Sequence, residues 1–366
     1  MGRLTLEAIE RRFGEVEALC GVDVAVEAGE ILGITGASGA GKSTLCRIVS
    51  GVETPTGGEV RIDGVPVTRM PPERRRVAAM FESYALYPHL AVFDNVAFPL
   101  RAPGAPRLTR AAIAARVREL LCLVELDGLE ERRPAELSGG QRQRVALCRA
   151  LVQDARASVL DEPISHLDAK LRHALRGTIR RRLTRAGAPA IWTSPDALET
   201  MAVADRVAVL VRGRLRQVGT PDDVYRRPAT LDVARLVGDP PLNLLRGEVV
   251  REGGALAFRH AGLVLPLPAS VARRLELGDA DRQAVLGLRP AEIALARDGA
   301  AGVAASVWVW EPLGRYGILS VRLGEDLIKL KAPRGLRFQP GETVVLDFTA
   351  AEPLLFDPVE GAALQA

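Results

Sequence analysis

The chain has 366 residues, of which 48% are apolar, and this length and composition predict about two domains with full hydrophobic cores. Its formal net charge is only +4, and the 49 basic and 45 acidic side chains are interspersed, so it lacks the concentrated basic stripe of a typical nucleic-acid-binding protein. No apolar run reaches the ~18 residues that span a bilayer and no signal-type segment opens the chain, so we expect any membrane contact to go through a partner.

The cysteines stand far apart in the chain, at Cys20, Cys46, Cys122 and Cys148. No two of them form a CxxC pair, and Cys46 and Cys148 fall on the apolar faces of expected helices. This pattern is typical of reduced thiols in a cytosolic protein.

The first residues predict two antiparallel strands. Apolar and polar residues alternate over residues 3–9 and again over 18–26, which is the period of a half-buried strand. Phe13 falls in the loop between them. Its ring is either a platform that stacks on a purine base or an ordinary core phenylalanine, and the residues alone leave both open.

A glycine-rich loop follows an apolar run at residues 31–34 and precedes a helical segment at 44–49. In such a loop, backbone N–H groups turn toward an anion and the helix start adds a positive dipole end. Lys42 then reaches the terminal phosphates, and the Ser43 hydroxyl can ligate Mg²⁺. The sequence therefore predicts a nucleoside triphosphate cradle. Its expected residues are Gly36, Ala37, Ser38, Gly39, Ala40, Gly41, Lys42, Ser43 and Thr44.

The next segment predicts a hairpin, a buried strand and a helix. Residues 59–62 lead into an Asp-Gly turn, and residues 77–81 form a short buried strand. The loop after this strand is polar and aromatic, and with Tyr84, Tyr87 and Phe98 it is a candidate docking patch for another protein. Thr109 caps a helix with a core-facing apolar stripe.

Residues 137–141 read Leu-Ser-Gly-Gly-Gln and open another helix. A serine N-cap with two glycines leaves the first N–H groups of the helix open to an anion. A plain capped helix needs no such pair, because each glycine weakens the first turn by up to ~1 kcal/mol relative to alanine. The predicted anion contacts are Ser138, Gly139, Gly140 and Gln141.

A short strand at residues 157–161 ends in two carboxylates. Asp161 is placed to hold Mg²⁺ through water beside the cradle, and Glu162 to polarise an attacking water. His166 reads as a loop residue before a helix that begins after Asp168. Further strands are expected at 190–193 and 207–211, with a helix at 197–203 between them.

From about residue 238 helical stripes nearly vanish. Short alternating runs recur between turn residues, at 263–267, 284–288, 303–309, 317–323, 327–330 and 343–348. We therefore predict an α/β P-loop domain over residues 1–237 and a small all-β barrel domain over 238–366.

With the cradle, the Leu-Ser-Gly-Gly-Gln run and Leu160-Asp161-Glu162-Pro163 in this order, the chain resembles the ATP-binding subunits of ABC transporters. The segments at residues 84–89, 167–172 and 286–290 are similar to the carbohydrate-importer branch, of the maltose and sn-glycerol-3-phosphate type. The resemblance implies an ABC ATPase fold with a helical subdomain at about 83–153, followed by an OB-like, TOBE-type regulatory domain.

The same resemblance implies ATP and Mg²⁺ as cofactors. Phe13 matches the adenine-stacking aromatic, Glu162 the catalytic acid, and Ser43, Glu82 and Asp161 the metal site. In the family, two ATPase subunits close head to tail over two ATPs, and each site combines one subunit's cradle with the other's Leu-Ser-Gly-Gly-Gln. Closure drives two membrane permeases, on which the loop at 84–98 docks, and an external binding protein delivers the solute. The implied location is the cytoplasmic face of the membrane, as a peripheral subunit. The interspersed charges independently disfavour nucleic acid as a partner.

Two positions depart from the family pattern. Glu82 stands where the family has Gln, and it adds negative charge beside Glu162. The family's His after the strand at 190–193 is absent, since that position is Pro195 in one alignment and Ser194 in the other. In the family this His contacts the γ-phosphate and the attacking water, and losing one such donor costs about 10² to 10³ in rate.

These departures leave three interpretations. In the first, the chain's own site binds Mg-ATP but hydrolyses it poorly, while its Leu-Ser-Gly-Gly-Gln completes a competent site on a paralogous ATPase, in a heterodimer. In the second, a homodimer is fully active, with Ser194 or Asp196 and a water in place of the imidazole. In the third, the chain is an ATP-gated clamp without a membrane partner, a class that usually lacks the β domain and the docking loop.

Overall fold

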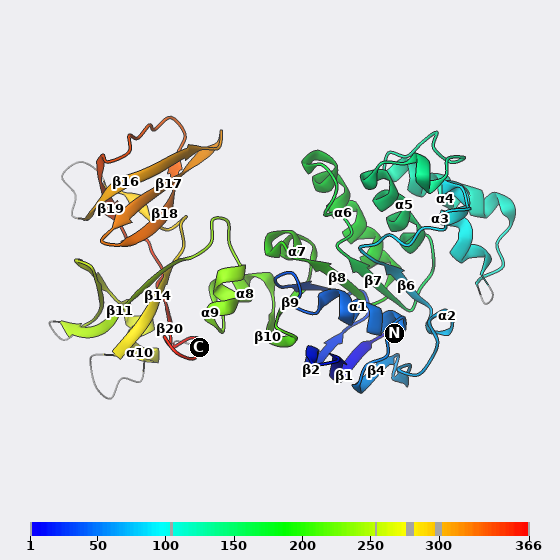
Figure 1. The fold of residues 1–366 in the computed structure, drawn as a ribbon, viewed down its shortest axis with the longest axis horizontal. Coiled ribbons are helices and arrows are strands. Elements are labelled where there is room, and N and C mark those ends of the chain that lie inside the picture. Colours follow the sequence, from blue (N-terminus) through cyan, green and yellow to red (C-terminus); the bar gives the residue numbers. More distant parts are fainter. Residues whose placement is uncertain (1, 103–104, 253–254, 276–281, 297–301, 365–366) are drawn as a thin grey trace. The chain divides into compact units, whose positions relative to one another are not determined.

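The computed structural model describes residues 2–102, 105–252, 255–275, 282–296 and 302–364. It consists of two compact units, Met1–Pro221 and Asp222–Ala366, each described by itself (Figure 1). Residues 222–237 therefore pack with the second unit, although the sequence changes character at residue 238. Among the described residues, no helix combines the length and the apolar content that crossing a bilayer requires.

A six-stranded sheet in the order β10-β9-β3-β8-β7-β6 forms the centre of the first unit. Five neighbouring strands run parallel, and β10 pairs antiparallel with β9 at the edge. The strands are β3 (Ile31–Thr35), β6 (Val77–Met80), β7 (Ala157–Asp161), β8 (Ala190–Ser194), β9 (Arg206–Val211) and β10 (Arg214–Gly219).

The inner strands of this sheet are buried on both faces, so successive residues enter different cores. One core contains Leu32, Ile34, Val159 and Ile191, and the other contains Ile31, Leu160, Ala190 and Trp192. The first core is shared with α1 (Lys42–Ser50) and a second sheet, and the other with helices.

The second sheet has the order β2-β1-β4-β5. Its strands are β1 (Leu4–Phe13), β2 (Val16–Val26), β4 (Gly57–Ile62) and β5 (Val65–Pro66). The predicted N-terminal hairpin is confirmed but is longer than the alternation indicated, so Phe13 is the last residue of β1 and pairs with Val16. Its side chain is 43% exposed, so the core interpretation of Phe13 is wrong.

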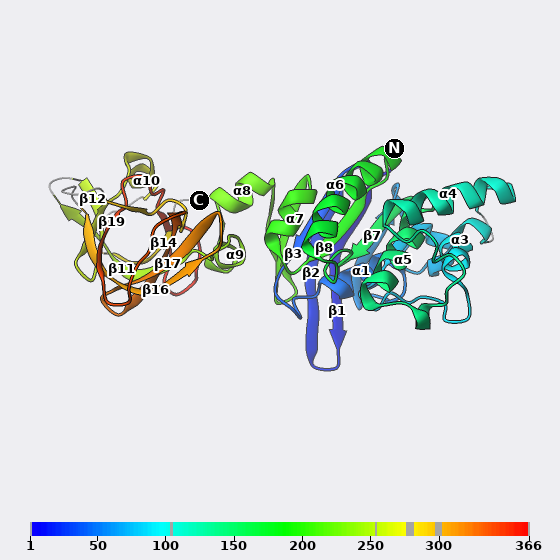
Figure 2. The same ribbon diagram turned by 90° about the horizontal axis from the view of Figure 1, so that it is seen from above.

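The remaining helices of this unit are α2 (Pro72–Arg75), α3 (Val92–Arg101), α4 (Arg110–Leu123), the 3₁₀ turn η1 (Pro134–Glu136), α5 (Gly139–Leu151), α6 (Ala169–Ala186) and α7 (Ala197–Val203). Helices α3, α4 and α5 gather on one side of the unit (Figure 2). The caps predicted from sequence are confirmed, because the side chains of Thr109 and Ser138 accept from Ala112 N and Gln141 N, each at 3.2 Å. Cys46 and Cys148 are buried, and all four cysteines are free.

The described residues of the second unit form two five-stranded antiparallel sheets, in the orders β13-β12-β11-β14-β20 and β15-β19-β16-β17-β18. The first consists of β11 (Asn243–Glu252), β12 (Ala255–His260), β13 (Leu263–Pro266), β14 (Arg282–Leu288) and β20 (Leu354–Phe356). The second consists of β15 (Ala294–Leu295), β16 (Val303–Pro312), β17 (Tyr316–Leu323), β18 (Asp326–Pro333) and β19 (Thr343–Asp347).

One hydrophobic core joins the two sheets of the second unit, so the predicted all-β domain is confirmed but its strands are divided between two sheets. In the described part of this unit, three short helices accompany them, α8 (Pro221–Arg226), α9 (Leu231–Leu236) and α10 (Ala269–Arg274). The buried guanidinium of Arg289 donates to the carbonyl oxygens of Val237, at 2.7 Å, and Tyr225. The Leu-Gly-Leu-Arg-Pro run thus ties β14 to the segment that carries α8 and α9.

Candidate functional site

The carboxyl ends of four parallel strands lie at one edge of the central sheet. β3 leads into the glycine-rich loop and α1, and β7 ends at Asp161, with Glu162 next. β8 ends at Ser194, and Glu82 follows β6 by two residues. The topology therefore brings together segments that are far apart in the sequence.

The loop at residues 36–41 depends on its glycines. Gly39 and Gly41 have φ angles of 78° and 108°, in the left-handed region that favours glycine. A Cβ on Gly36 would stand 2.1 Å from the carbonyl oxygen of Leu210, and one on Gly41 2.6 Å from that of Ala18. No side chain caps α1, so its first N–H groups remain available to an anion.

Lys42 folds back over this loop. Its ammonium donates to the carbonyl oxygens of Gly36 and Ala37, at 2.8 and 3.1 Å. Burial lowers the pKa of Lys42, while the nearby carboxylates of Glu162, Asp161 and Glu82 raise it. The ammonium and three acids therefore share one electrostatic environment. Of the other loop residues, Ala37, Ser38 and Gly39 are exposed, Ala40 is buried, and Ser43 and Thr44 are half-buried.

The two acids after β7 have different surroundings. Asp161 is 1% exposed, and its Oδ1 accepts from the Thr193 hydroxyl at 2.5 Å. Glu162 has a φ of 51°, and its N–H donates to the carbonyl oxygen of Thr193 at 3.1 Å. Burial and then the Glu82 carboxylate raise the pKa of Glu162, against the lowering effect of Lys42. Glu162 therefore holds a proton more readily than a free glutamate does.

The donor set at this edge suits a magnesium triphosphate. The Ser43 hydroxyl and the carboxylates of Asp161 and Glu82 are hard oxygen ligands, which Mg²⁺ prefers. Within the described ranges, no three His, Cys, Asp or Glu side chains converge on one point. A magnesium ion here would therefore also take oxygens from the triphosphate.

Ser138 forms a reciprocal capping box with Gln141 at the start of α5, in which Ser138 N also donates to Gln141 Oε1 at 2.8 Å. Ser138 and Gly139 are exposed, and a Cβ on Gly139 would meet nothing within 4 Å. A Cβ on Gly140 would lie 3.4 Å from the carbonyl oxygen of His166. In the described part of the chain, no hydrogen bond of these residues reaches the glycine-rich loop.

Three contacts around the turn at residues 162–166 were not predicted from sequence. Gln143 on α5 is fully buried, and its Nε2 donates to the Glu162 carbonyl oxygen at 2.9 Å. Its Oε1 accepts from the N–H of His166 at 3.2 Å. The Tyr84 hydroxyl lies 2.9 Å from His166 Nδ1. No local pattern marks these residues, because their partners are 19 to 82 positions away.

The polar groups at the end of β8 are engaged in starting α7. Ser194 is 1% exposed, and its Oγ accepts from Asp196 N at 3.1 Å. Asp196 Oδ1 accepts from the N–H groups of Leu198 and Glu199, at 2.9 and 3.2 Å. Both candidate replacements for the absent imidazole thus have structural roles.

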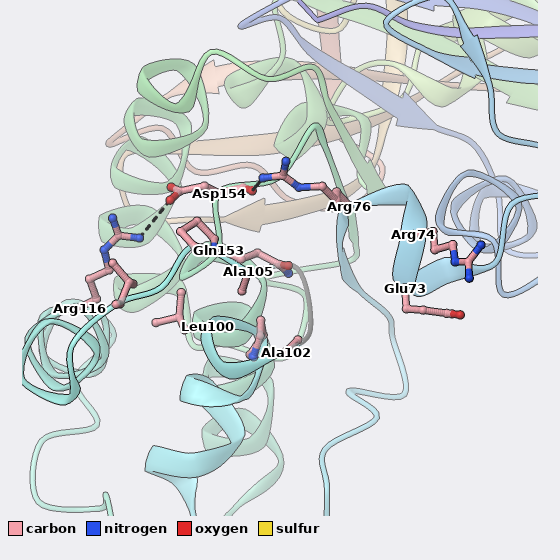
Figure 3. A pocket seen from close by; sticks show the side chains of 12 residues that line it. Glu73, Arg74, Arg76, Leu100, Ala102, Ala105, Arg116, Gln153 and Asp154 are labelled. Carbon is pink, nitrogen blue, oxygen red and sulfur yellow. Dashed lines mark hydrogen bonds and ion pairs between the residues drawn. The ribbon is translucent and has the colours of Figure 1, made fainter.

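A separate cavity of about 330 Å³ lies among α2, the end of α3, α4 and the segment after α5. Figure 3 shows Arg116 pointing toward Asp154, with 3.2 Å between Arg116 Nη1 and Asp154 Oδ2. Arg76 donates to the carbonyl oxygen of Asp154 at 3.3 Å. None of the predicted nucleotide-site residues lines this cavity.

The chain matches three family profiles: ABC transporter over residues 19–165, MalK OB fold domain over 238–293 and TOBE domain over 286–356. It is 37% identical over 364 residues to the sn-glycerol-3-phosphate import ATP-binding protein UgpC of Paraburkholderia xenovorans, covering 99% of both chains. It belongs to the ABC transporter ATP-binding proteins. The chain is thus an ABC-type ATPase with a P-loop domain followed by OB and TOBE domains.

Other relatives of this ABC ATPase include the sulfoquinovosyl glycerol transport ATP-binding protein SmoE of Agrobacterium fabrum, which is 37% identical, with 98% of each chain covered. Dimeric structures of the ABC transporter cassette MJ0796 match with a TM-score of 0.56 and 27% identity, over 60% of this chain and 98% of theirs. One of them is a post-hydrolysis state bound to ADP and Pi.

Proposed function

We propose that this ABC ATPase energises the import of a sugar, polyol or glycerol-like solute. The observation that carries the proposal is the similarity over nearly the whole chain, including the OB and TOBE domains, to proteins named as import or transport ATP-binding proteins for glycerol-containing solutes. We place the functional boundary at residues 237 and 238, where the OB profile begins. The helical subdomain would span about 83–153.

The edge of the central sheet at which β3, β6, β7 and β8 end is the proposed Mg-ATP site. The backbone of residues 36–41 and Lys42 would hold the phosphates, and Phe13 would stack on the adenine from the tip of its hairpin. Ser43, Asp161 and Glu82 would provide oxygens to Mg²⁺, whose charge would offset that of the phosphates. The raised pKa of Glu162 makes its carboxylate a stronger base than that of a free glutamate, which suits a general base acting on water.

The proposed partners are a second ATPase subunit, two integral-membrane permeases and an external solute-binding protein. The chain would sit on the cytoplasmic face of the membrane as a peripheral subunit, with residues 84–98 docked on the permeases. Two ATPase subunits would face each other, so that Ser138, Gly139, Gly140 and Gln141 of each complete the other's site. The exposure of Ser138 and Gly139 supports this arrangement.

We further propose that the two sites are unequal and that the second subunit is a paralogue. Proline at position 195 supplies neither a donor nor a base, and Ser194 and Asp196 are engaged at the start of α7. Glu82 adds a negative charge beside Glu162, as its effect on that pKa indicates. The chain's own site would bind Mg-ATP and turn over slowly, while its Leu-Ser-Gly-Gly-Gln serves a competent site on the partner.

The test compares two variants in the reconstituted transporter. Glu162→Gln should leave most of the ATPase activity, whereas Gly140→Asp should abolish it, because the new carboxylate repels the partner's nucleotide. Gly177→Asp is the matched control, since Gly177 is an exposed glycine within α6 and should tolerate the same change.

A large ATPase loss from Glu162→Gln would contradict unequal sites and favour an active homodimer. Failure of the chain to co-purify with membrane subunits, or to bind ATP, would contradict the importer function itself.

A further inference from the structure

The bend after β6 holds two residues with side chains in the left-handed region, Tyr84 at φ 62° and Ala85 at φ 45°. Such conformations persist only where surrounding contacts fix them. Arg149 of α5 provides two of these contacts, donating to the carbonyl oxygens of Tyr84 and Ala85 at 2.8 and 2.7 Å. The bend lies two residues after Glu82, so its conformation constrains the backbone that leads to that carboxylate.

A further contact comes from the tyrosine side chain. The Tyr84 hydroxyl lies 2.9 Å from His166 Nδ1, and the two rings meet edge to face at 86°. The Ser165 hydroxyl lies 3.2 Å from the same nitrogen. His166 is exposed, so filling the core is not its role. Both neighbours are hydroxyls that donate or accept, so Nδ1 has a partner whether or not it carries a proton.

His166 also belongs to the turn that begins at Glu162. Gln143 binds both ends of this turn, through the Glu162 carbonyl oxygen and the His166 N–H. The imidazole is close enough to Glu162 to lower the pKa of its carboxyl group. His166 therefore links the bend that follows Glu82 to the turn that begins at Glu162, directly after Asp161.

We propose that His166 is a positioning residue of the nucleotide site, which holds the Tyr84 hydroxyl and so fixes Glu82 beside Asp161 for the magnesium ion. His166 does not itself touch the nucleotide in this arrangement. The inference rests on the proposed Mg-ATP site and adds to it a residue that sets the geometry of one metal ligand.

The test uses the purified full-length chain and two single variants, Tyr84→Phe and His166→Leu. Each removes the same hydrogen bond, so each should weaken Mg-ATP affinity about fivefold, the effect of one neutral hydrogen bond. ATP affinity measured in EDTA should stay unchanged, because Glu82 acts only through the metal. Without nucleotide, amide hydrogen exchange over residues 83–88 should become about fivefold faster.

The double variant and a conservative variant identify the hydrogen bond as the cause. Tyr84→Phe combined with His166→Leu should be no weaker than either single variant, because both break one contact. His166→Asn should restore parental affinity and exchange, since Asn Oδ1 occupies nearly the place of His Nδ1 and accepts from the tyrosine hydroxyl. His173→Leu, at an exposed histidine of α6, is the matched control and should change nothing.

Three outcomes would overturn the inference while Mg-ATP binding by the parent chain remains: no effect of His166→Leu, additive effects in the double variant, or an Asn variant as weak as the Leu variant. Equal weakening with and without magnesium would also overturn it. If the parent chain does not bind Mg-ATP, the proposed function fails instead, and the exchange measurement still shows whether His166 holds the bend.

Discussion

Helices α1 and α5 both begin with glycine-rich segments, yet their first turns differ. At α1 no side chain caps the helix, and the preceding loop contains two glycines, Gly36 and Gly41, at which a Cβ would clash with backbone oxygens. At α5 Ser138 and Gln141 close a capping box, and Gly139 has open space around it. The first helix start leaves its N–H groups uncapped, as the proposed phosphate site requires, whereas the second satisfies one of its own N–H groups with a side chain and leaves Gly139 exposed.

The charges follow the same division. Lys42 and three carboxylates share the environment of α1, whereas Ser138, Gly139, Gly140 and Gln141 at α5 are uncharged. Two glycine-rich helix starts in one chain are therefore not interchangeable. Their differences allow experiments that affect one and spare the other.

The largest difference in ATP affinity should come from replacing one glycine by alanine at each of the two helix starts. Gly36→Ala places a Cβ 2.1 Å from the Leu210 carbonyl oxygen, so the loop must shift and ATP affinity should fall about 100-fold. Gly139→Ala meets nothing within 4 Å and should leave ATP binding unchanged, while stabilising α5 by up to ~1 kcal/mol. Fluorescent-nucleotide titration and thermal unfolding measure both. If Gly36→Ala and Gly139→Ala lowered ATP affinity equally, the distinction between the two helix starts would be wrong.

Removing the ammonium tests the charged side of the comparison. Lys42→Met should weaken ATP binding about 30-fold, within the range for hydrogen bonds to charged groups. It should also raise the pKa of Glu162 further, because the Lys42 charge now lowers it. Isothermal titration of ATP checks the first effect. Lys170→Met, at an exposed residue of α6, is the control and should leave the affinity unchanged.

A pH series tests the carboxylates beside α1. The pKa of Glu162 is raised above its usual 4.5, so on mild acidification Glu162 gains a proton and repels the triphosphate less. ATP affinity should therefore fall a few-fold as pH rises through the raised pKa of Glu162. It should fall again in alkali, as Lys42 loses its proton below its usual 10.5. Glu162→Gln should remove the fall in affinity at acid pH and keep the fall in alkali. Because the nucleotide titrates identically with both chains, its own titration drops out of the comparison. If the parent chain and Glu162→Gln gave the same dependence of ATP affinity on pH, the assignment of the acid step to Glu162 would be wrong.

The smallest effect is expected at the self-capped helix. Ser138→Ala removes the cap of α5, which costs about 1 kcal/mol of folding stability. For a unit of this size that lowers Tm by about 2–4 °C. ATP affinity of the isolated chain should not change, since no hydrogen bond among the described residues joins Ser138 to the loop at α1. A loss of affinity comparable to that of Lys42→Met would show that α5 contributes to the chain's own site.

Elements with a strong local signal were predictable from sequence. Thr109 and Ser138 were identified as caps because a hydroxyl before an apolar stripe is a short-range pattern, and α7 begins and ends where the sequence predicted. The helix–strand alternation and the glycine loop were enough to place Lys42 and Asp161 at one edge of a parallel sheet.

Elements that depend on distant partners were not predictable. Strand β11 was missed because charged residues such as Glu248 and Arg251 interrupt its alternation, and its hairpin partner β12 was missed with it. Their packing is visible only in three dimensions, where a Cβ on Gly247 would stand 2.6 Å from the Phe258 ring. Likewise nothing near His166 in the sequence indicates Tyr84, which is 82 positions away.

The two-sided burial of β7 has a consequence for the acids at its end. Val159 and Leu160 enter opposite cores, and Asp161 is the last residue of the strand, directly before Glu162. A slip of one residue against β8 would exchange the residues that enter the two cores and would move Asp161 off its pairing with Thr193. The position of the two acids is thus set by the buried apolar residues directly upstream, and an insertion there would displace both carboxylates from the proposed nucleotide site without removing either from the chain.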